Sequence, residues 1–207
     1  TRGRIAAVTN VRNGIAAESA PRSRGSLVRD FVRGNDGAME STRTLQGEAA
    51  QFGPFNLLLW DGRELAFASN QPRAQHAPVT PGIHAMSNGA FDAPWPKSTF
   101  ATRALEAWVR SIPGSGTTTH DPPDIEPLFT ALADRGIAPD DALPDTGVGI
   151  ALERTLSPPF ILDERYGTRC STVVLAGSAG ILFVERRFGP SGTPAGESSA
   201  FLALDQQ

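Results

Sequence analysis

The sequence predicts an α+β fold with four layers, α-β-β-α, and mostly antiparallel sheets. Two β-hairpins are recognisable, at 55–69 and 168–188, and their strands carry apolar residues on both faces. A sheet of this kind must be covered on both sides, and several amphipathic helical patterns supply the cover. The 207 residues and 40% hydrophobic content suit a single domain over 1–207 with a sizeable core.

The first quarter of the chain is expected to form one strand and two helices. Residues 5–11 are short and apolar and favour a strand that ends near Asn10. Apolar residues between 27 and 32 recur at helical spacing, and Gly34 ends that helix. A second helix is expected to begin with Ser41 as its N-cap and to continue through residue 52.

The clearest strand signal runs from 54 to 70. Residues 55–60 and 64–69 flank Asp61-Gly62, a pair that favours a tight two-residue hairpin turn. Residues 71–81 are predicted to cross to the next element as a polar segment without a strand.

A loop rich in proline and glycine follows, from Thr80 to Lys97, and carries Ser87, Asn88 and Asp92. Prolines fix one backbone torsion each and glycines allow bends, so the loop has a defined shape. Two interpretations are open at this point. The loop is an ordinary connection between a strand and a helix, or it is a site, since loops positioned by a scaffold often carry function.

The second half of the chain is predicted to hold two helices and a second sheet. Apolar residues repeat at helical spacing over 100–112, before a Pro-Gly-Ser-Gly stop at 113–116. They repeat again over 125–132, with Asp121 as a cap and Pro122 in the first turn. Residues 138–154 are expected to form a loop with at most one helical turn. The remaining predicted elements are central strands at 168–175 and 180–188 and a closing edge strand at 199–205.

Composition excludes several classes of function. The net charge is −3 and the charged residues are interspersed along the chain, so no basic surface is expected that would attract nucleic acid. No apolar run reaches the roughly 20 residues that span a bilayer, so no stable membrane insertion is expected. The lone cysteine, Cys170, is expected to be buried and inert within a strand. His76, His84 and His120 lack the spacing of metal ligands, and no phosphate-binding loop occurs, so no metal or resident cofactor is predicted.

A small polar set remains at predicted strand ends and loops: Asn10, Asn56, Asn88 and Arg169. Amides donate to oxyanions, and a guanidinium holds carboxylates or lowers the pKa of a nucleophile. Buried amides equally satisfy the main chain of loops. The residues alone leave both roles open.

Short motifs in the same order over nearly the whole chain resemble the NRDE family, also called the transport and Golgi organisation family. The matching segments are 1–10, 23–28, 53–58, the loop 80–97 with Ser87-Asn88 and Pro94-Trp95, and 166–172. The resemblance implies the four-layered fold of N-terminal-nucleophile hydrolases. It also implies that a cysteine and an Asn-Arg-Asp-Glu motif belong upstream of residue 1, so Thr1 is not expected to be a nucleophile.

The resemblance implies roles for particular residues. By similarity to related cysteine amidohydrolases, Asn10 and Asn88 would stabilise an oxyanion and Arg169 would lie near the nucleophile. For the family itself it implies haem trafficking, or a role in lipid or acyl metabolism, by a cytoplasmic carrier of a hydrophobic ligand. Met86, Ser87, Asn88, Trp95 and Arg169 are the expected ligand-binding residues, with Phe91 also against the macrocycle and Arg169 or Arg2 on a haem propionate. The alternative is a cysteine-dependent amidohydrolase acting on C–N amide bonds.

Overall fold

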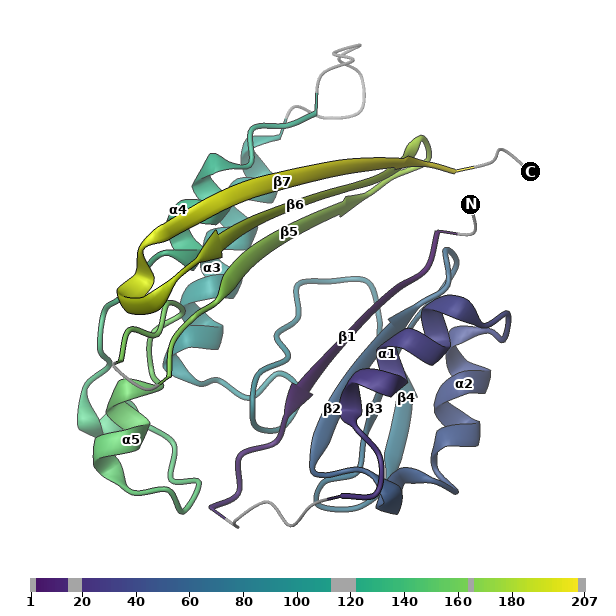
Figure 1. Ribbon diagram of the computed structural model, residues 1–207, viewed down its shortest axis with the longest axis horizontal. Helices are drawn as coiled ribbons and strands as arrows, with labels where there is room; N and C mark the ends of the chain where they lie inside the picture. Colours follow the sequence, from purple (N-terminus) through teal and green to yellow (C-terminus); the bar gives the residue numbers. More distant parts are fainter. Residues whose placement is uncertain (1–2, 15–19, 113–121, 164–165, 205–207) are drawn as a thin grey trace. The chain divides into compact units, whose positions relative to one another are not determined.

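The computed structural model describes residues 3–14, 20–112, 122–163 and 166–204, and its elements form an α+β chain with antiparallel sheets (Figure 1). This class and this pairing confirm the prediction. Contacts divide the chain into two compact units, Thr1–Ala93 with Leu204–Gln207, and Pro94–Ala203. The stacking of four layers and the single domain over 1–207 stay predictions. Features predicted at Thr1, Arg2, His120, Asp121 and 113–116 lie outside the described residues.

The first unit is built on a four-stranded antiparallel sheet in the order β1-β2-β3-β4. Its strands are β1 (Ile5–Asn10), β2 (Phe55–Trp60), β3 (Leu65–Ser69) and β4 (Gln75–Pro78). The prediction that 71–81 lacks a strand was wrong. Main-chain pairing of Ser69 with Gln75 places β4 at the sheet edge, where a strand needs no apolar alternation because one side meets solvent.

The β2–β3 hairpin is confirmed, but its tip lies one residue later than predicted. Asp61 faces Glu64, whose carbonyl accepts from the Asp61 N–H, and the two residues at the tip are Gly62 and Arg63. Gly62 has a φ of 95°, in the left-handed region that favours glycine. The carboxylate of Asp61 accepts from the N–H groups of Arg63 and Glu64.

Helices α1 (Arg24–Arg33) and α2 (Ala38–Leu45) cover one face of this sheet (Figure 1). Ser23 caps α1 by accepting from Gly25 N–H, and the prediction that Gly34 ends the helix is confirmed. Ser41 is not an N-cap, because α2 begins three residues earlier. The carboxylate of Asp61 accepts from Ala38 N–H at 2.8 Å and so caps α2 from 23 residues away.

The second predicted helix also ends earlier than expected, at Leu45, and a 3-10 turn at Ala49–Gln51 follows. The core beneath the two helices joins them to the central strands. Its fully or nearly buried members include Leu57 and Leu59 of β2, whose partners across the sheet are Ala68 and Ala66 of β3. Small residues opposite large ones let α2 approach β3 closely.

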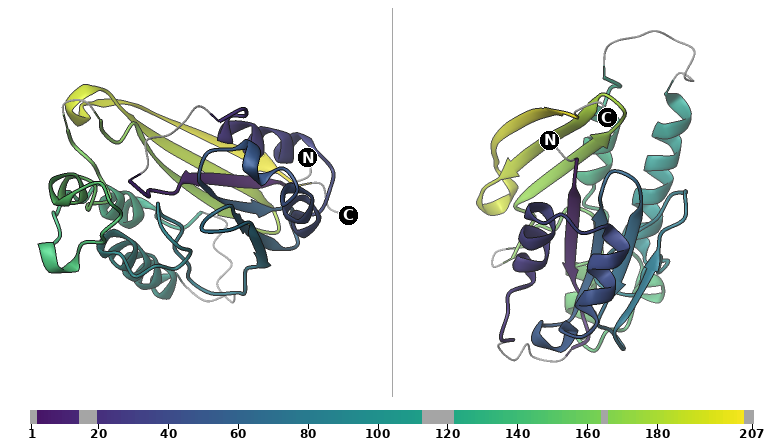
Figure 2. Two further views of the ribbon diagram at one scale, coloured as in Figure 1. Left: turned by 90° about the horizontal axis from the view of Figure 1, so that it is seen from below. Right: turned by 90° about the vertical axis from the view of Figure 1, so that its right-hand side faces the viewer.

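The second unit holds a three-stranded sheet in the order β5-β6-β7, drawn as a twisted ribbon in Figure 2. Its strands are β5 (Cys170–Ala176), β6 (Gly180–Phe188) and β7 (Pro194–Ala203). The edge position of β7 confirms the prediction, although the strand begins five residues earlier. Only β6 is central here, because β5 is the other edge among the described residues.

The helices of this unit are α3 (Pro96–Ser111), α4 (Glu126–Leu132) and α5 (Ile150–Thr155), with 3-10 turns at Asp140–Ala142 and Pro190–Gly192. The side chain of Phe129 packs α4 on Val173 and Val184 of the sheet, and Trp108 Nε1 of α3 donates to Asp124 O ahead of α4. Within the described residues, no helix is long and apolar enough to cross a membrane.

Three further predictions for this unit were wrong. Pro122 precedes α4, and the proline of its first turn is Pro127, while the N–H of Glu126 is capped by Asp124. The segment 138–154 was predicted to hold at most one helical turn, around 139–143, and the 3-10 turn at Asp140–Ala142 lies there, but helix α5 begins in the same segment as well, because two glycines ahead of it obscured a short helical run. Cys170 is exposed, because it begins an edge strand on the face opposite the buried Ser171 and Val173.

Alanine at Gly180 is expected to lower the free energy of unfolding by about 1–2 kcal/mol. A Cβ at this position would lie 2.5 Å from Leu202 O and 2.6 Å from the Phe201 ring, so β7 would have to shift. Gly177, in the same hairpin, has open space around it and provides the matched control. Urea unfolding should separate the two alanine variants. Equal midpoints would contradict the close approach of β7.

Candidate functional site

The segment 80–93 is anchored to the face of the first sheet that lies opposite the two helices. Thr9 and Asn56 face each other across β1 and β2, and both donate to Ser87 O, at 2.7 and 3.2 Å. The Asn56 amide also donates to Gly89 O at 2.6 Å. Asn56 is 1% exposed, so these bonds satisfy a buried amide. Of the two roles considered for Asn56, the structure therefore supports the one in which the amide satisfies the main chain of the loop.

The structure brings the two predicted asparagines, Asn10 and Asn88, together. Asn88 Nδ2 donates to Asn10 O at 3.0 Å, and Asn88 O accepts from Arg12 N–H at 2.7 Å. The side chain of Asn10, at the end of β1, is exposed. The Asn88 amide thus holds the loop on β1 through a main-chain carbonyl, while the Asn10 amide faces solvent.

A stack of rings fixes the far side of the same loop. The Phe91 ring lies 4.6 Å from Phe67 of β3 and 5.5 Å from His84, centroid to centroid. His84 Nδ1 lies 2.7 Å from Asp92 Oδ2, and its Nε2 lies 2.9 Å from Thr80 O. The hydrogen bond with Asp92 raises the pKa of His84 above its ordinary value. Burial pushes the pKa of Asp92 upward, but His84 and the Ala85 N–H outweigh it, so that pKa is lowered.

The other predicted ligand-binding residues fall in different places. Met86 and Ser87 are half-buried in the anchored loop of the first unit. Trp95 and Arg169 belong to the second unit. Trp95 is half-buried at the start of α3, with Lys97 Nζ 5.9 Å from its ring. Arg169 is exposed and lines a cavity of about 240 Å³ together with Tyr166 and residues 189–192.

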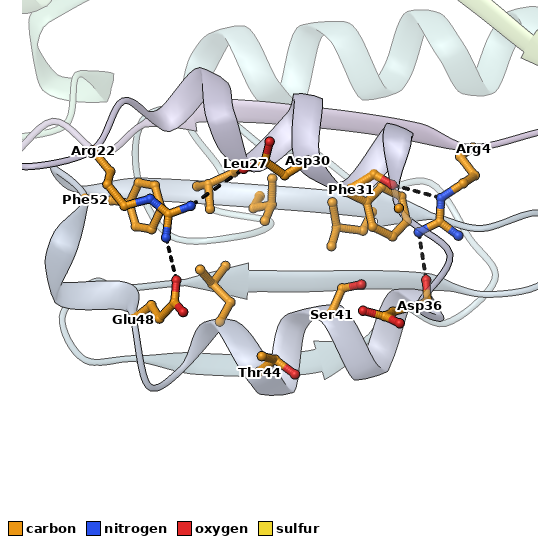
Figure 3. Close-up of a pocket in the computed structure, with 14 residues that line it drawn as sticks. Arg4, Arg22, Leu27, Asp30, Phe31, Asp36, Ser41, Thr44, Glu48 and Phe52 are labelled. Carbon is orange, nitrogen blue, oxygen red and sulfur yellow. Dashed lines mark hydrogen bonds and ion pairs between the residues drawn. The ribbon is translucent and has the colours of Figure 1, made fainter.

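A second cavity, of about 210 Å³, lies in the first unit between α1 and α2 (Figure 3). Its floor is apolar and nearly inaccessible to solvent. The floor residues are Leu27 and Phe31 of α1, Phe52, and Leu57 and Leu59 of β2. The volume is below the range of about 300–1,000 Å³ that encloses a drug-sized ligand, so this groove suits only a short apolar group.

An arginine lies at each end of the groove (Figure 3). Arg22 stacks on Phe52 at 4.7 Å and pairs with Glu48 at 2.5 Å. Arg4 stacks on Phe31 at 3.9 Å, where its Nε donates to Phe31 O. Sequence reasoning missed this groove, because the arginines come from segments 18 residues apart that no local pattern joins.

The described part of the chain contains no group of three histidine, cysteine or acidic side chains arranged to hold a metal ion. The chemistry offered by the loop site is therefore that of amides, a hydroxyl, a thioether and aromatic rings. Such a set binds a partly apolar molecule and donates a few hydrogen bonds to it.

Comparison with known proteins agrees with the sequence motifs. The family model for Transport and Golgi organisation 2 matches residues 1–190. The human Transport and Golgi organization protein 2 homolog is 29% identical over 201 residues, which cover 90% of this chain and 69% of that protein. The mouse Transport and Golgi organization 2 homolog is 23% identical over 97% of this chain and 74% of its own length. The chain belongs to the Transport and Golgi organisation 2 family.

Proposed function

We propose that this protein is a cytoplasmic carrier of a hydrophobic metabolite, haem or an acyl compound, and that the loop bearing Met86, Ser87 and Asn88 contacts the ligand. The observation that carries the proposal is the use of the loop's amides. Asn56 donates to two loop carbonyls, and Asn88 donates to Asn10 O. Amides that hold the main chain serve a shaped binding surface better than an oxyanion hole, whose donors must point at the reacting atom.

The side chains of this loop fit an amphipathic ligand. Met86 is flexible and polarisable, which suits contact with a flat macrocycle or an acyl chain. Phe91 is fixed against Phe67 and supplies an apolar wall. The main-chain carbonyl of Ser87 accepts the bonds from Thr9 and Asn56, so its side-chain hydroxyl can bind a polar group of the ligand.

A titration of the full-length protein with haem, followed by the Soret band, tests this proposal. We expect a saturable shift, and we expect Met86→Ala to weaken haem binding by about fivefold to tenfold, since burying its side chain contributes on the order of 1 kcal/mol. Trp95→Ala and Arg169→Ala, changed one at a time, test the two predicted residues of the second unit. Arg33→Ala, on the exposed end of α1, is the control. Absence of any saturable shift would sink the haem proposal.

One observation favours the alternative, an amidohydrolase. Asn10 and Asn88 are neighbours, as the resemblance to cysteine amidohydrolases implies, and the Asn10 side chain is exposed. In that case Asn10→Ala should slow amide hydrolysis by the full-length protein by about 100-fold or more, the usual cost of losing one oxyanion donor. A carrier predicts no hydrolysis for this substitution to reduce.

A further inference from the structure

The loop that carries Ser87 and Asn88 is closed at its base by one charged pair. Ala85 and Asp92 face each other, because Asp92 N–H donates to Ala85 O at 2.9 Å and Ala85 N–H donates to Asp92 Oδ1 at 2.7 Å. Asp92 has a φ of 57°, which aspartate tolerates better than most residues. The second carboxylate oxygen, Oδ2, is left for His84.

Both ring nitrogens of His84 face hydrogen-bond acceptors. Thr80 O can only accept, so the Nε2 that lies 2.9 Å from it carries a proton. The carboxylate of Asp92 is ionised and also accepts, so Nδ1 carries the second proton. A histidine with both nitrogens protonated is a cation. Both acceptors are therefore satisfied at once only by the charged form of His84, which then joins Thr80 to Asp92.

Loss of one proton from His84 would break its hydrogen bond to Thr80 and keep the one to Asp92. The anionic Asp92 would keep the remaining proton on Nδ1, because a charged acceptor makes the stronger hydrogen bond. The bare Nε2 would then face Thr80 O, with a lone pair on each atom. That contact is repulsive, so the segment that starts at Thr80 would move away and the ring would lose its fixed position on Phe91.

Among the described residues, one charged partner affects the pKa of His84. Asp92 is the charged group that acts on the ring from its own loop. On the sheet side Phe91 covers the ring, and behind it Phe67 of β3 is uncharged. The side chain of His84 is about one quarter exposed, so protons reach it from solvent.

We propose that His84 and Asp92 are positioning residues for the Met86–Asn88 segment, and that this segment is ordered when His84 is charged and loosened when it is neutral. The consequence for ligand binding rests on the proposed function, whereas the ordering itself does not. Near neutral pH the protein would bind its ligand tightly on the acidic side and release it on the alkaline side.

Amide hydrogen exchange tests the ordering without any ligand. After correction for intrinsic rates, exchange of the amides from 86 to 91 should accelerate on the order of fivefold between pH 6 and pH 8.5, the equivalent of one hydrogen bond. In His84→Gln it should be fast at both values. In His84→Arg, a cation that does not titrate in this range, it should be slow at both. His76→Gln, on β4, is the control and should behave as the wild type.

The outcomes separate the two proposals. The positioning role is overturned, even if haem binds, if the corrected exchange rates of the wild type do not change with pH. It is also overturned if the rates in His84→Gln equal those of the wild type. A pH-dependent segment without haem binding at either pH overturns the proposed function alone. Haem affinity that falls between pH 6 and pH 8.5 in the wild type, but not in His84→Arg, supports both.

Discussion

Replacing Asn56 with aspartate is expected to lower the free energy of unfolding by about 4 kcal/mol at pH 7. The side chain is 1% exposed, and its amide donates to the carbonyls of Ser87 and Gly89. A carboxylate there has nothing to donate and places negative charge against two carbonyl oxygens. Typical domains are stable by about 5–15 kcal/mol, so this change alone would remove between about a quarter and most of that stability and weaken the attachment of the loop.

The effect of Asn56→Asp should depend on pH. The buried site favours the neutral acid, so the folded state raises the pKa of the new carboxyl above about 3.9. The folded protein binds this proton more tightly than the unfolded chain does, so protonation stabilises the folded variant as pH falls. The loss of unfolding free energy relative to the wild type should therefore become smaller between pH 7 and pH 4.5. Urea unfolding at both values measures it. Gln75→Glu, an exposed amide-to-acid change on β4, is the control. Equal deficits for the two variants would contradict the structural role of Asn56.

Replacing Asp61 with alanine is expected to cost about 2–3 kcal/mol. Its two carboxylate oxygens accept from three main-chain N–H groups, those of Ala38, Arg63 and Glu64. Ala38 is fully buried, so its N–H would lose its partner. Asp61→Asn has one acceptor oxygen in place of two and should cost about half as much. A thermal or urea midpoint equal to that of the wild type in Asp61→Ala would refute the capping of α2 by this residue.

The contribution of Asp61 should disappear in acid. Burial pushes its pKa upward, but the three main-chain N–H groups and the charge of Arg4 outweigh burial, and the pKa lies below 3.8. A lowered pKa means that the stabilisation is fully present above pH 3.8 and is lost as pH falls through the folded-state pKa. The difference in unfolding free energy between wild type and Asp61→Ala should therefore be constant near neutrality and narrow below pH 3.8.

Local patterns predicted those parts of the fold that depend on neighbouring residues. The apolar periodicity around Phe31 predicted α1, and the apolar runs on both sides of the Asp61-Gly62 pair predicted the β2–β3 hairpin. The start of α2 could not be predicted, because its cap comes from the tip of a hairpin 23 residues later. Strand β4 was not predicted, because an edge strand such as Gln75–Pro78 is specified by its partner's main chain rather than by its own side chains.

The candidate site was predicted in part. The resemblance implied that Asn10 and Asn88 would both stabilise an oxyanion, which stays a prediction. The structure brings the two residues together, but no sequence pattern shows that the amide of Asn88 donates to the carbonyl of Asn10. The sequence also left the role of Asn56 open, because burial decides it. The bridge between His84 and Asp92 could have been suspected from their positions in one loop, yet its charge follows only from the acceptor at Thr80.

A carrier binds its hydrophobic metabolite reversibly and releases it unchanged. Transfer of haem from the loaded full-length protein to apomyoglobin, followed by the change in the Soret band, tests this most directly. We expect intact haem to leave the protein, and transfer to be faster at pH 8.5 than at pH 6. A protein that cannot be loaded with haem at either pH, or that returns a chemically altered product, would refute the role of a haem carrier.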